Sequence, residues 1–272
     1  MTSTEPHPEM RHNPKHLLEF FSRSLTSFQS SQDVFRVLCT LPHHQEDQTA
    51  APAPRKPNGS SPVKKLLVLD SSFNPPTRAH AQMARSALKW AGSSGGGGGG
   101  GARVMLLLAV NNADKAPKPA SFPVRLGMMD GFGRSLLEGL RGEVQGQVQV
   151  QIDLAVTKMP YFHDKARAIS ESGFYGYDFT RDGGELEQVF LVGFDTVIRI
   201  FNPKYYGSPE GDREAGMRAA LGPFFERARL RVTMRPDDEW GDKGEQEDYV
   251  KGLEDGALEG VGGIKRGRGG LI

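Results

Sequence analysis

The segment Leu66–His80 constrains the fold of this chain more than any other part of the sequence. Residues 65–69 form a short apolar run that is typical of a buried β-strand. A small polar turn follows and delivers Thr77 and His80 to the first turn of a helix predicted over about 79–90. A strand, a tight loop and a helix N-terminus together place backbone N–H groups and an imidazole where they can face a phosphate. We therefore expect an anion site at the carboxyl end of the first strand of an α/β sheet.

Composition and charge narrow the class of protein. The chain has 272 residues, enough for one large α/β domain with extras or for two small domains. With 37% of its residues hydrophobic and 25% charged, a packed core is feasible and the flanks must be polar. The net charge of +1 gives no general attraction to nucleic acid or to an anionic membrane. The single cysteine, Cys39, excludes an internal disulfide and a cysteine-rich zinc site, and it favours a reducing compartment.

The sequence shows no targeting or membrane segment. Residues 1–16 lack the apolar core of a signal peptide. The longest apolar run, Val104–Val110, is far shorter than the roughly 20 residues needed to span a bilayer. We expect a protein of the cytoplasm or the nucleus, with no membrane partner and no nucleic-acid partner.

Residues 1–62 are predicted to form an N-terminal extension. A Phe-rich amphipathic helix is expected over about 14–38, with a break near Ser30, and a Pro-, Ala- and Ser-rich linker follows. Two roles remain open for this helix. It either packs on the main domain as a brace or docks a partner.

Residues 63–255 are predicted to form the main domain, because apolar strands alternate there with helices. This order favours a parallel sheet of about five strands with helices on both faces. The predicted strands are 65–69, 103–110, 147–156, 187–192 and 229–234. The glycine-rich insert 92–101 is expected to be a flexible surface loop with no phosphate-binding role. Residues 256–272 are expected to be a flexible tail.

His80 is the sharpest candidate for a functional residue. Five of the seven histidines precede residue 45, and only His80 and His163 lie in the predicted sheet domain. An imidazole just inside a helix N-terminus can donate a hydrogen bond to a phosphate oxygen, and the helix dipole favours the anion. The alternative is a histidine that caps or packs locally.

The string Ser71–His80, SSFNPPTRAH, resembles the GSFNPxTxxH signature of the nicotinamide/nicotinic-acid mononucleotide adenylyltransferases. Within it, Thr77–His80 matches the (H/T)xxH pattern of the wider nucleotidylyltransferase superfamily. Ser71 replaces the usual glycine, and serine restricts a backbone that glycine leaves free. The resemblance covers about residues 64–253 and is closest to a fungal adenylyltransferase-like branch. It implies a Rossmann-like nucleotidylyltransferase fold.

Further blocks extend the resemblance along the chain. Lys115, in the loop after the second predicted strand, aligns with a lysine that the family uses on phosphate; the alternative is a solvated loop lysine. Arg125 is expected to have a structural role, pairing with loop acids or carbonyls. Gly193 and Asp195 resemble a G-x-D motif whose aspartate binds the adenosine ribose, the alternative being a helix N-cap. Arg235 lies where the family often carries an arginine near the ATP phosphates.

One aromatic position is also implied by the family. Tyr161 or Phe162 lies where the family stacks a ring on the nicotinamide, although core packing is an equal alternative. The neighbouring His163 and Lys165 are expected at the surface.

The resemblance implies transfer of an adenylyl group from ATP, accompanied by Mg²⁺, to nicotinamide or nicotinic-acid mononucleotide. His80 and Lys115 would be the catalytic residues, and no protein ligand to a metal is predicted. Ser72 and Phe73 would hold the mononucleotide phosphate and the ATP through backbone N–H groups, and Thr77 would complete the phosphate site. Another mononucleotide or phosphate acceptor of the same superfamily remains an alternative.

One family motif is missing. The late I-S-S-T-x-x-R string, which places hydroxyls and a basic side chain against the ATP phosphates, does not occur in this sequence. Either the chain is a truncated or alternatively spliced product, or its site lacks these contacts. The second case leaves a nucleotide-binding protein with impaired transferase activity.

Overall fold

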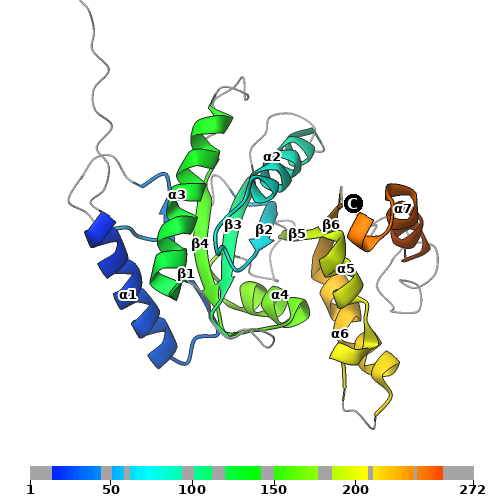
Figure 1. Ribbon diagram of the computed structural model, residues 1–272. Coiled ribbons are helices and arrows are strands. Elements are labelled where there is room, and N and C mark those ends of the chain that lie inside the picture. The colour runs from blue at the N-terminus through cyan, green and yellow to red at the C-terminus, as the bar shows by residue number, and fades with distance from the viewer. Residues whose placement is uncertain are drawn as a thin grey trace, which may run out of the picture.

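A six-stranded sheet in the order β1-β4-β3-β2-β5-β6 lies at the centre of the computed structural model (Figure 1). The structure describes residues 14–43, 51–57, 62–93, 101–111, 120–141, 150–176, 186–207, 211–235 and 238–253. The strands are β1 (Phe35–Leu41), β2 (Lys65–Asp70), β3 (Ala102–Ala109), β4 (Ile152–Thr157), β5 (Glu187–Gly193) and β6 (Ala228–Thr233). The helices are α1 (Pro14–Ser30), α2 (Arg78–Ser93), α3 (Phe122–Leu140), α4 (Phe162–Glu171), α5 (Phe194–Ile200), α6 (Arg213–Arg227) and α7 (Lys243–Gly252), with short 3-10 turns at Pro203–Tyr205 and Asp238–Trp240.

Strands β2 to β6 run parallel, as the alternation of strands and helices predicts. Their apolar runs are buried on both faces. Leu66 and Val68 of β2 belong to one core cluster, whereas Leu67 and Leu69 belong to the other. This division follows from the two-residue period of a strand. The chain thus adopts the α/β, Rossmann-like arrangement expected from the sequence.

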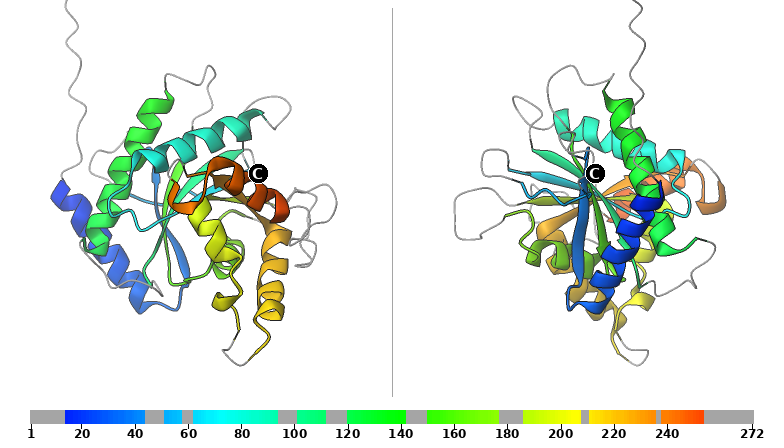
Figure 2. Two further views of the ribbon diagram at one scale, coloured as in Figure 1. Left: turned by 45° about the vertical axis from the view of Figure 1, so that its right-hand side comes forward. Right: turned by 90° about the vertical axis from the view of Figure 1, so that its left-hand side faces the viewer.

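Helices cover the two faces in two groups (Figure 2). Helices α1, α2 and α3 contribute to the cluster that contains Leu67, and α4, α5 and α6 contribute to the cluster that contains Leu66. The chain builds outward from β2 through β3 to β4, then returns past β2 to add β5 and β6. Because parallel crossovers are right-handed, this reversal moves the later helices to the opposite face. Within the part of the chain that the structure describes, no helix is both long and apolar enough to cross a membrane.

The N-terminal segment differs from the prediction. The helix expected over about 14–38 ends at Ser30, and residues 35–41 form β1, which pairs antiparallel with β4. The sheet therefore has six strands, one of them antiparallel, where about five parallel strands were expected. The error came from extending the helical spacing of Leu17–Phe28 into FRVLCTL, an apolar run whose backbone hydrogen bonds are completed by β4. Helix α1 packs along α3 through buried Phe21, Leu25 and Phe28, so it is a brace.

A buried polar cluster near the amino ends of the parallel strands holds β1 against β4. Asp153 of β4 pairs with Arg103 at 2.9 Å, and it accepts hydrogen bonds from Thr40 at 2.6 Å and from the Tyr175 hydroxyl at 2.8 Å. Burial raises the pKa of Asp153 to about 6, although the positive charge of Arg103 acts to lower it. Arg103 also donates to the carbonyl of Arg55 at 2.8 Å, so this cluster ties residues 51–57 to the sheet.

Two glycines of α3 provide a matched test of the packing. A Cβ at Gly133 would lie 2.6 Å from Leu41 Cδ1 of β1, whereas a Cβ at Gly131 would have no atom within 4 Å. We expect Gly133→Val to lower the free energy of unfolding by about 1–3 kcal/mol, because the fully buried Leu41 has little room to move. Gly131→Val carries the same change in helix propensity and should be nearly neutral, within about 0.5 kcal/mol. Urea unfolding measures both; equal losses in the two variants would contradict this packing.

Candidate functional site

The predicted site residues that the structure describes lie at the carboxyl edge of the sheet. Strand β2 lies between β3 and β5. From β2 the chain continues to β3 on one side, and after β4 it returns to form β5 on the other side, so the order of the strands reverses at β2. In open α/β sheets, ligands bind outside the carboxyl ends of the strands at this switch point. The loop after β2 carries His80, and the turn after β5 carries Asp195. Parallel strands bring these segments to the same edge (Figure 1).

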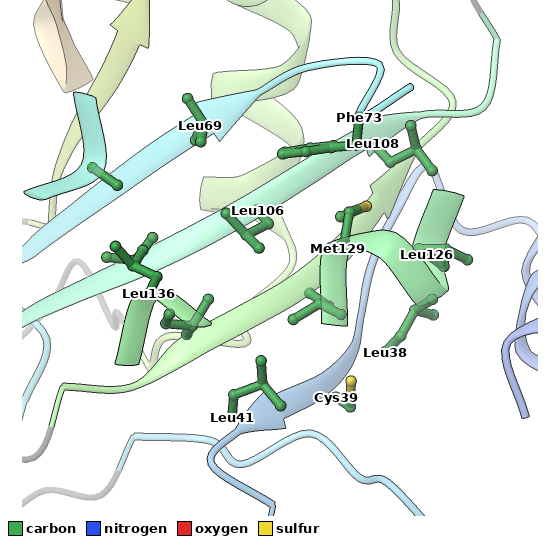
Figure 3. Packing of buried hydrophobic residues seen from close by; sticks show 14 of the residues in the cluster. Leu38, Cys39, Leu41, Leu69, Phe73, Leu106, Leu108, Leu126, Met129 and Leu136 are labelled. Carbon is green, nitrogen blue, oxygen red and sulfur yellow. The ribbon is translucent and has the colours of Figure 1, made fainter. Parts of the chain in front are cut away.

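Phe73 anchors the loop between β2 and α2. Its backbone is left-handed, with φ 45°, and its side chain is fully buried. The ring packs 5.8 Å from the His80 ring and 6.4 Å from the Phe132 ring, between centroids. Figure 3 shows it in the same cluster as Leu108 and Met129. A left-handed residue costs about 1–2 kcal/mol, which burial of a phenylalanine offsets. The loop is thereby held in one conformation.

The T-x-x-H spacing has a direct structural reason. His80 is the third residue of α2, and its Nδ1 accepts a hydrogen bond from the backbone N–H of Thr77 at 2.9 Å. The Thr77 hydroxyl lies 2.8 Å from the same nitrogen. In a capping box, the side chain of the third helical residue accepts a hydrogen bond from the backbone N–H of the residue before the helix. The His80 imidazole makes this contact here with Thr77. The other ring nitrogen, Nε2, lies 3.0 Å from Ser71 Oγ.

This network determines the protonation of His80. Because Nδ1 accepts the Thr77 N–H, the ring proton of the neutral imidazole lies on Nε2, which donates to Ser71. Partial burial lowers the pKa of His80 below its ordinary value of 6.5, and the positive charge of Arg235 lowers it further. At neutral pH the side chain is therefore an uncharged hydrogen-bond donor held from both ends.

The remaining loop residues divide by exposure. Ser72 and Thr77 are exposed, whereas Phe73 between them is buried. Ser72 consequently lies at the surface of the loop, next to a residue that fixes its backbone. The contribution of the Phe73 side chain is to anchor the loop through its buried ring.

Asp195 and Arg235 form an ion pair. Asp195 Oδ1 accepts from Arg235 Nε at 3.0 Å and from Nη2 at 2.8 Å. Gly193 leaves room for this pair, because a Cβ there would lie 2.7 Å from Asp195 Oδ1. The N-cap of α5 is Gly193, and Asp195 is in the first turn. The alternative of Asp195 as an N-cap is therefore wrong.

The backbone of Arg235 is held by the fully buried Gln246 of α7. Gln246 Oε1 accepts the Arg235 N–H at 2.9 Å, and its Nε2 donates to the Arg235 carbonyl at 3.2 Å. A capping box made by Asp242 and Glu245 starts α7. Helix α7 thus positions Arg235, a role that the sequence did not suggest.

The two aromatic candidates after β4 have different surroundings. Phe162 meets the ring of Phe190 edge-on at 5.6 Å and packs against the core beneath α4. Tyr161 is 40% exposed and stacks on His163, with ring centroids 5.6 Å apart. His163, expected at the surface, is partly buried and also contacts Tyr206. Of the two candidates, Tyr161 is the ring open to solvent.

Lys165 was expected at the surface and is instead buried. Its side chain is 5% exposed and pairs with Asp70, the last residue of β2, whose side chain is 10% exposed. The ammonium also lies 5.2 Å from the Phe162 ring centroid. Sequence reasoning missed this contact because it joins residues far apart in the chain. The available signal was a carboxylate that ends an otherwise apolar strand.

Two other predictions concern the second crossover. Lys115 lies outside the described residues. Arg125 is buried and donates to the carbonyl of Ala120 at 2.9 Å, which confirms its structural role. Among the described residues, no group of three or more His, Cys, Asp or Glu side chains is placed to hold a metal ion.

Comparison with known proteins shows a partial similarity to a yeast protein. No family model matches the chain. The chain is 36% identical over 162 residues to a protein of Schizosaccharomyces pombe named "Putative nicotinamide mononucleotide adenylyltransferase". The alignment covers 60% of this chain and 50% of that protein, so the chain spans about half the length of the relative it matches.

The surroundings of His80 predict its titration. We expect its imidazole to titrate below 6.5, and we expect Arg235→Gln to raise this pKa because a neighbouring positive charge is removed. The pKa should remain below the ordinary value, since burial is the larger cause. Arg231→Gln, on β6 just before Arg235 but bonded to Ser86, is the control and should leave the pKa unchanged. NMR titration measures the effect, with His80→Ala to assign the resonance. An unchanged pKa in Arg235→Gln would refute the proximity of the two groups.

Proposed function

We propose that this chain binds ATP and a pyridine mononucleotide, in the nicotinamide or the nicotinic-acid form, and transfers the adenylyl group between them. The products would be the dinucleotide and pyrophosphate. The observation that carries the proposal is the neutral, doubly held imidazole of His80 at the switch point of the sheet. The similarity to the Schizosaccharomyces pombe protein supports the same activity.

The chemistry requires positioning more than covalent participation. A phosphate oxygen of the mononucleotide attacks the α-phosphorus of ATP, and the bond from that phosphorus to the β-phosphate oxygen breaks as pyrophosphate leaves. The nucleophile is already an anion, so no enzyme base is needed. The protein aligns two anions and stabilises charge on the non-bridging oxygens of the α-phosphate. His80 would supply its Nε2–H to one of these oxygens, from the direction that the Ser71 hydroxyl sets in the free protein.

Asp195 and Arg235 would change partners when ATP binds. The Asp195 carboxylate would accept from the ribose hydroxyls, and Arg235 would move to the phosphates. The arginine side chain is 44% exposed in the pair. An exposed pair contributes only about 0–1 kcal/mol, so contacts with the nucleotide are able to replace it. The pair keeps both groups ordered in the free protein.

The remaining predicted contacts fit around this centre. Backbone N–H groups of Ser72 and Phe73 would hold phosphate oxygens, and Lys115 would add positive charge. Tyr161 would stack on the pyridine ring. Mg²⁺ would arrive with ATP as part of the substrate. Its ligands would come from phosphate oxygens and water, as is usual for this ion.

A second candidate function is nucleotide binding without transfer. The groups at the carboxyl edge of the sheet would serve binding with or without transfer, because the Asp195–Arg235 pair and the His80 loop are available to a nucleotide in either case. In this case ATP would bind through Asp195, Arg235 and the His80 loop, and no dinucleotide would form.

Substitution of His80 tests the proposed activity. Loss of a comparable charge-stabilising donor costs about 2.7–4 kcal/mol of barrier, so His80→Ala should lower the rate of dinucleotide formation by about 10²–10³-fold. His16→Ala, at an exposed position of α1, is the matched control and should retain the full rate. The measurement is chromatographic detection of dinucleotide from ATP–Mg²⁺ and each mononucleotide. A His80→Ala rate near that of the parent chain rejects the role of His80. ATP binding without product in the parent chain supports the second candidate.

The ribose contact of Asp195 has a separate test. Hydrogen bonds to a charged group contribute about 1.5–3 kcal/mol, so the parent chain should bind 2′,3′-dideoxy-ATP at least about tenfold more weakly than ATP. Asp195→Asn should bind both nucleotides with similar, weaker affinity, because the discriminating carboxylate is gone. Calorimetric titration measures the four affinities. Undiminished discrimination in Asp195→Asn would place the ribose elsewhere.

A further inference from the structure

The buried ion pair of Asp70 and Lys165 is not used by the proposed chemistry. Its two side chains are 10% and 5% exposed, so both charges are largely removed from water. Lys165 projects from α4 and lies over the ring of Phe162. The pair therefore joins the carboxyl end of β2 to a helix on one face of the sheet.

Asp70 immediately precedes the loop that holds His80. Side chains of consecutive strand residues point to opposite faces, and Leu66 and Val68 mark the face toward α4. Asp70 continues that face and reaches Lys165. Ser71 points to the other face, toward α2, where its hydroxyl meets His80 Nε2 at 3.0 Å. The Ser71 N–H also donates to the Leu107 carbonyl at 3.2 Å, which extends the β2–β3 ladder by one residue.

Stability alone gives little reason for such a pair. Removing two charges from water costs several kcal/mol for each ion, and the attraction between the ions offsets this desolvation cost only when their geometry is good. Apolar side chains of similar volume often stabilise a buried site equally well or better. What an ion pair adds is a defined position for each partner. Here the partner that is held in place is Asp70, the residue next to Ser71.

We propose that Asp70 and Lys165 are positioning residues that fix Ser71, and through it the direction of the His80 Nε2–H. The end of β2 is then held from both faces, by Lys165 on one side and by His80 on the other. The consequence for catalysis rests on the proposed function. The consequence for the His80 hydrogen bond does not, and it can be measured without substrate.

The experiment compares two paired replacements in the full chain. Asp70→Leu combined with Lys165→Met replaces the pair by apolar side chains. Glu187→Gln combined with Arg229→Met is the matched control, because that pair of 2.8 Å joins β5 and β6 at the amino edge, far from the loop. Asp70→Asn is a milder variant that retains the shape of the side chain. Three readouts are needed: urea unfolding, hydrogen exchange of the His80 Nε2–H by NMR, and the kinetics of dinucleotide formation.

We expect the Asp70→Leu/Lys165→Met variant to keep the unfolding free energy of the parent chain or to exceed it. Its His80 Nε2–H should nonetheless exchange at least about tenfold faster, and kcat should fall about 10- to 100-fold with little change in KM, as misplacement of a catalytic group predicts. Asp70→Asn should change the same quantities in the same direction by smaller factors. The Glu187→Gln/Arg229→Met control should leave exchange and kcat unaltered.

The readouts separate the possible failures. Parent-like exchange at His80 in both Asp70 variants overturns the inference and leaves the pair purely structural. A rise in KM with an unchanged kcat also overturns it, because it indicates that Lys165 binds substrate directly. If the parent chain makes no dinucleotide but exchange still accelerates in the variants, the proposed function fails while the positioning role stands.

Discussion

The parallel pairing of β2 with both β3 and β5 is the constraint on which the rest of the structure depends. It places the end of β2 at the point where the chain reverses its direction of growth across the sheet. The loops after β2, β5 and β6 then share one edge. Groups separated in sequence, such as His80, Asp195 and Arg235, come close enough for Arg235 to influence the pKa of His80. Helices on both faces hold this edge from either side.

Two ion pairs lie near the site in the ligand-free protein. Asp195 pairs with Arg235 at the surface, and Asp70 pairs with Lys165 in the interior. The two pairs differ in what they can do. The exposed pair costs little to open and suits an exchange of partners on binding. The buried pair is costly to break and suits the fixing of a position. His80 is the neutral hydrogen-bond donor of the site, bonded to Ser71 next to one pair and influenced by Arg235 of the other.

The N-terminal region shows where pattern reasoning failed and why. Residues 14–30 carry a helical spacing of apolar residues that predicted the helix, and the structure decided its role by placing it against α3. The next apolar run has no spacing that distinguishes a helix from a buried strand. Its state was decided by β4, which offers a free edge, and by the Arg103–Asp153 pair beside Thr40. Likewise, Lys165 carries no local sign of burial, because its partner Asp70 is distant in the chain.

By itself, the sequence determined the local order of strands and helices in residues 63–253 and the loop with Thr77 and His80. Both depend on contacts between residues near one another in the chain: apolar periodicity, and the three-residue spacing that lets an imidazole reach back to the preceding N–H. Only the tertiary structure decided the antiparallel edge strand, the pairing of Asp195 with Arg235 and the burial of Lys165. These depend on partners brought together by the sheet, and no local pattern records the desolvation and pairing that select them.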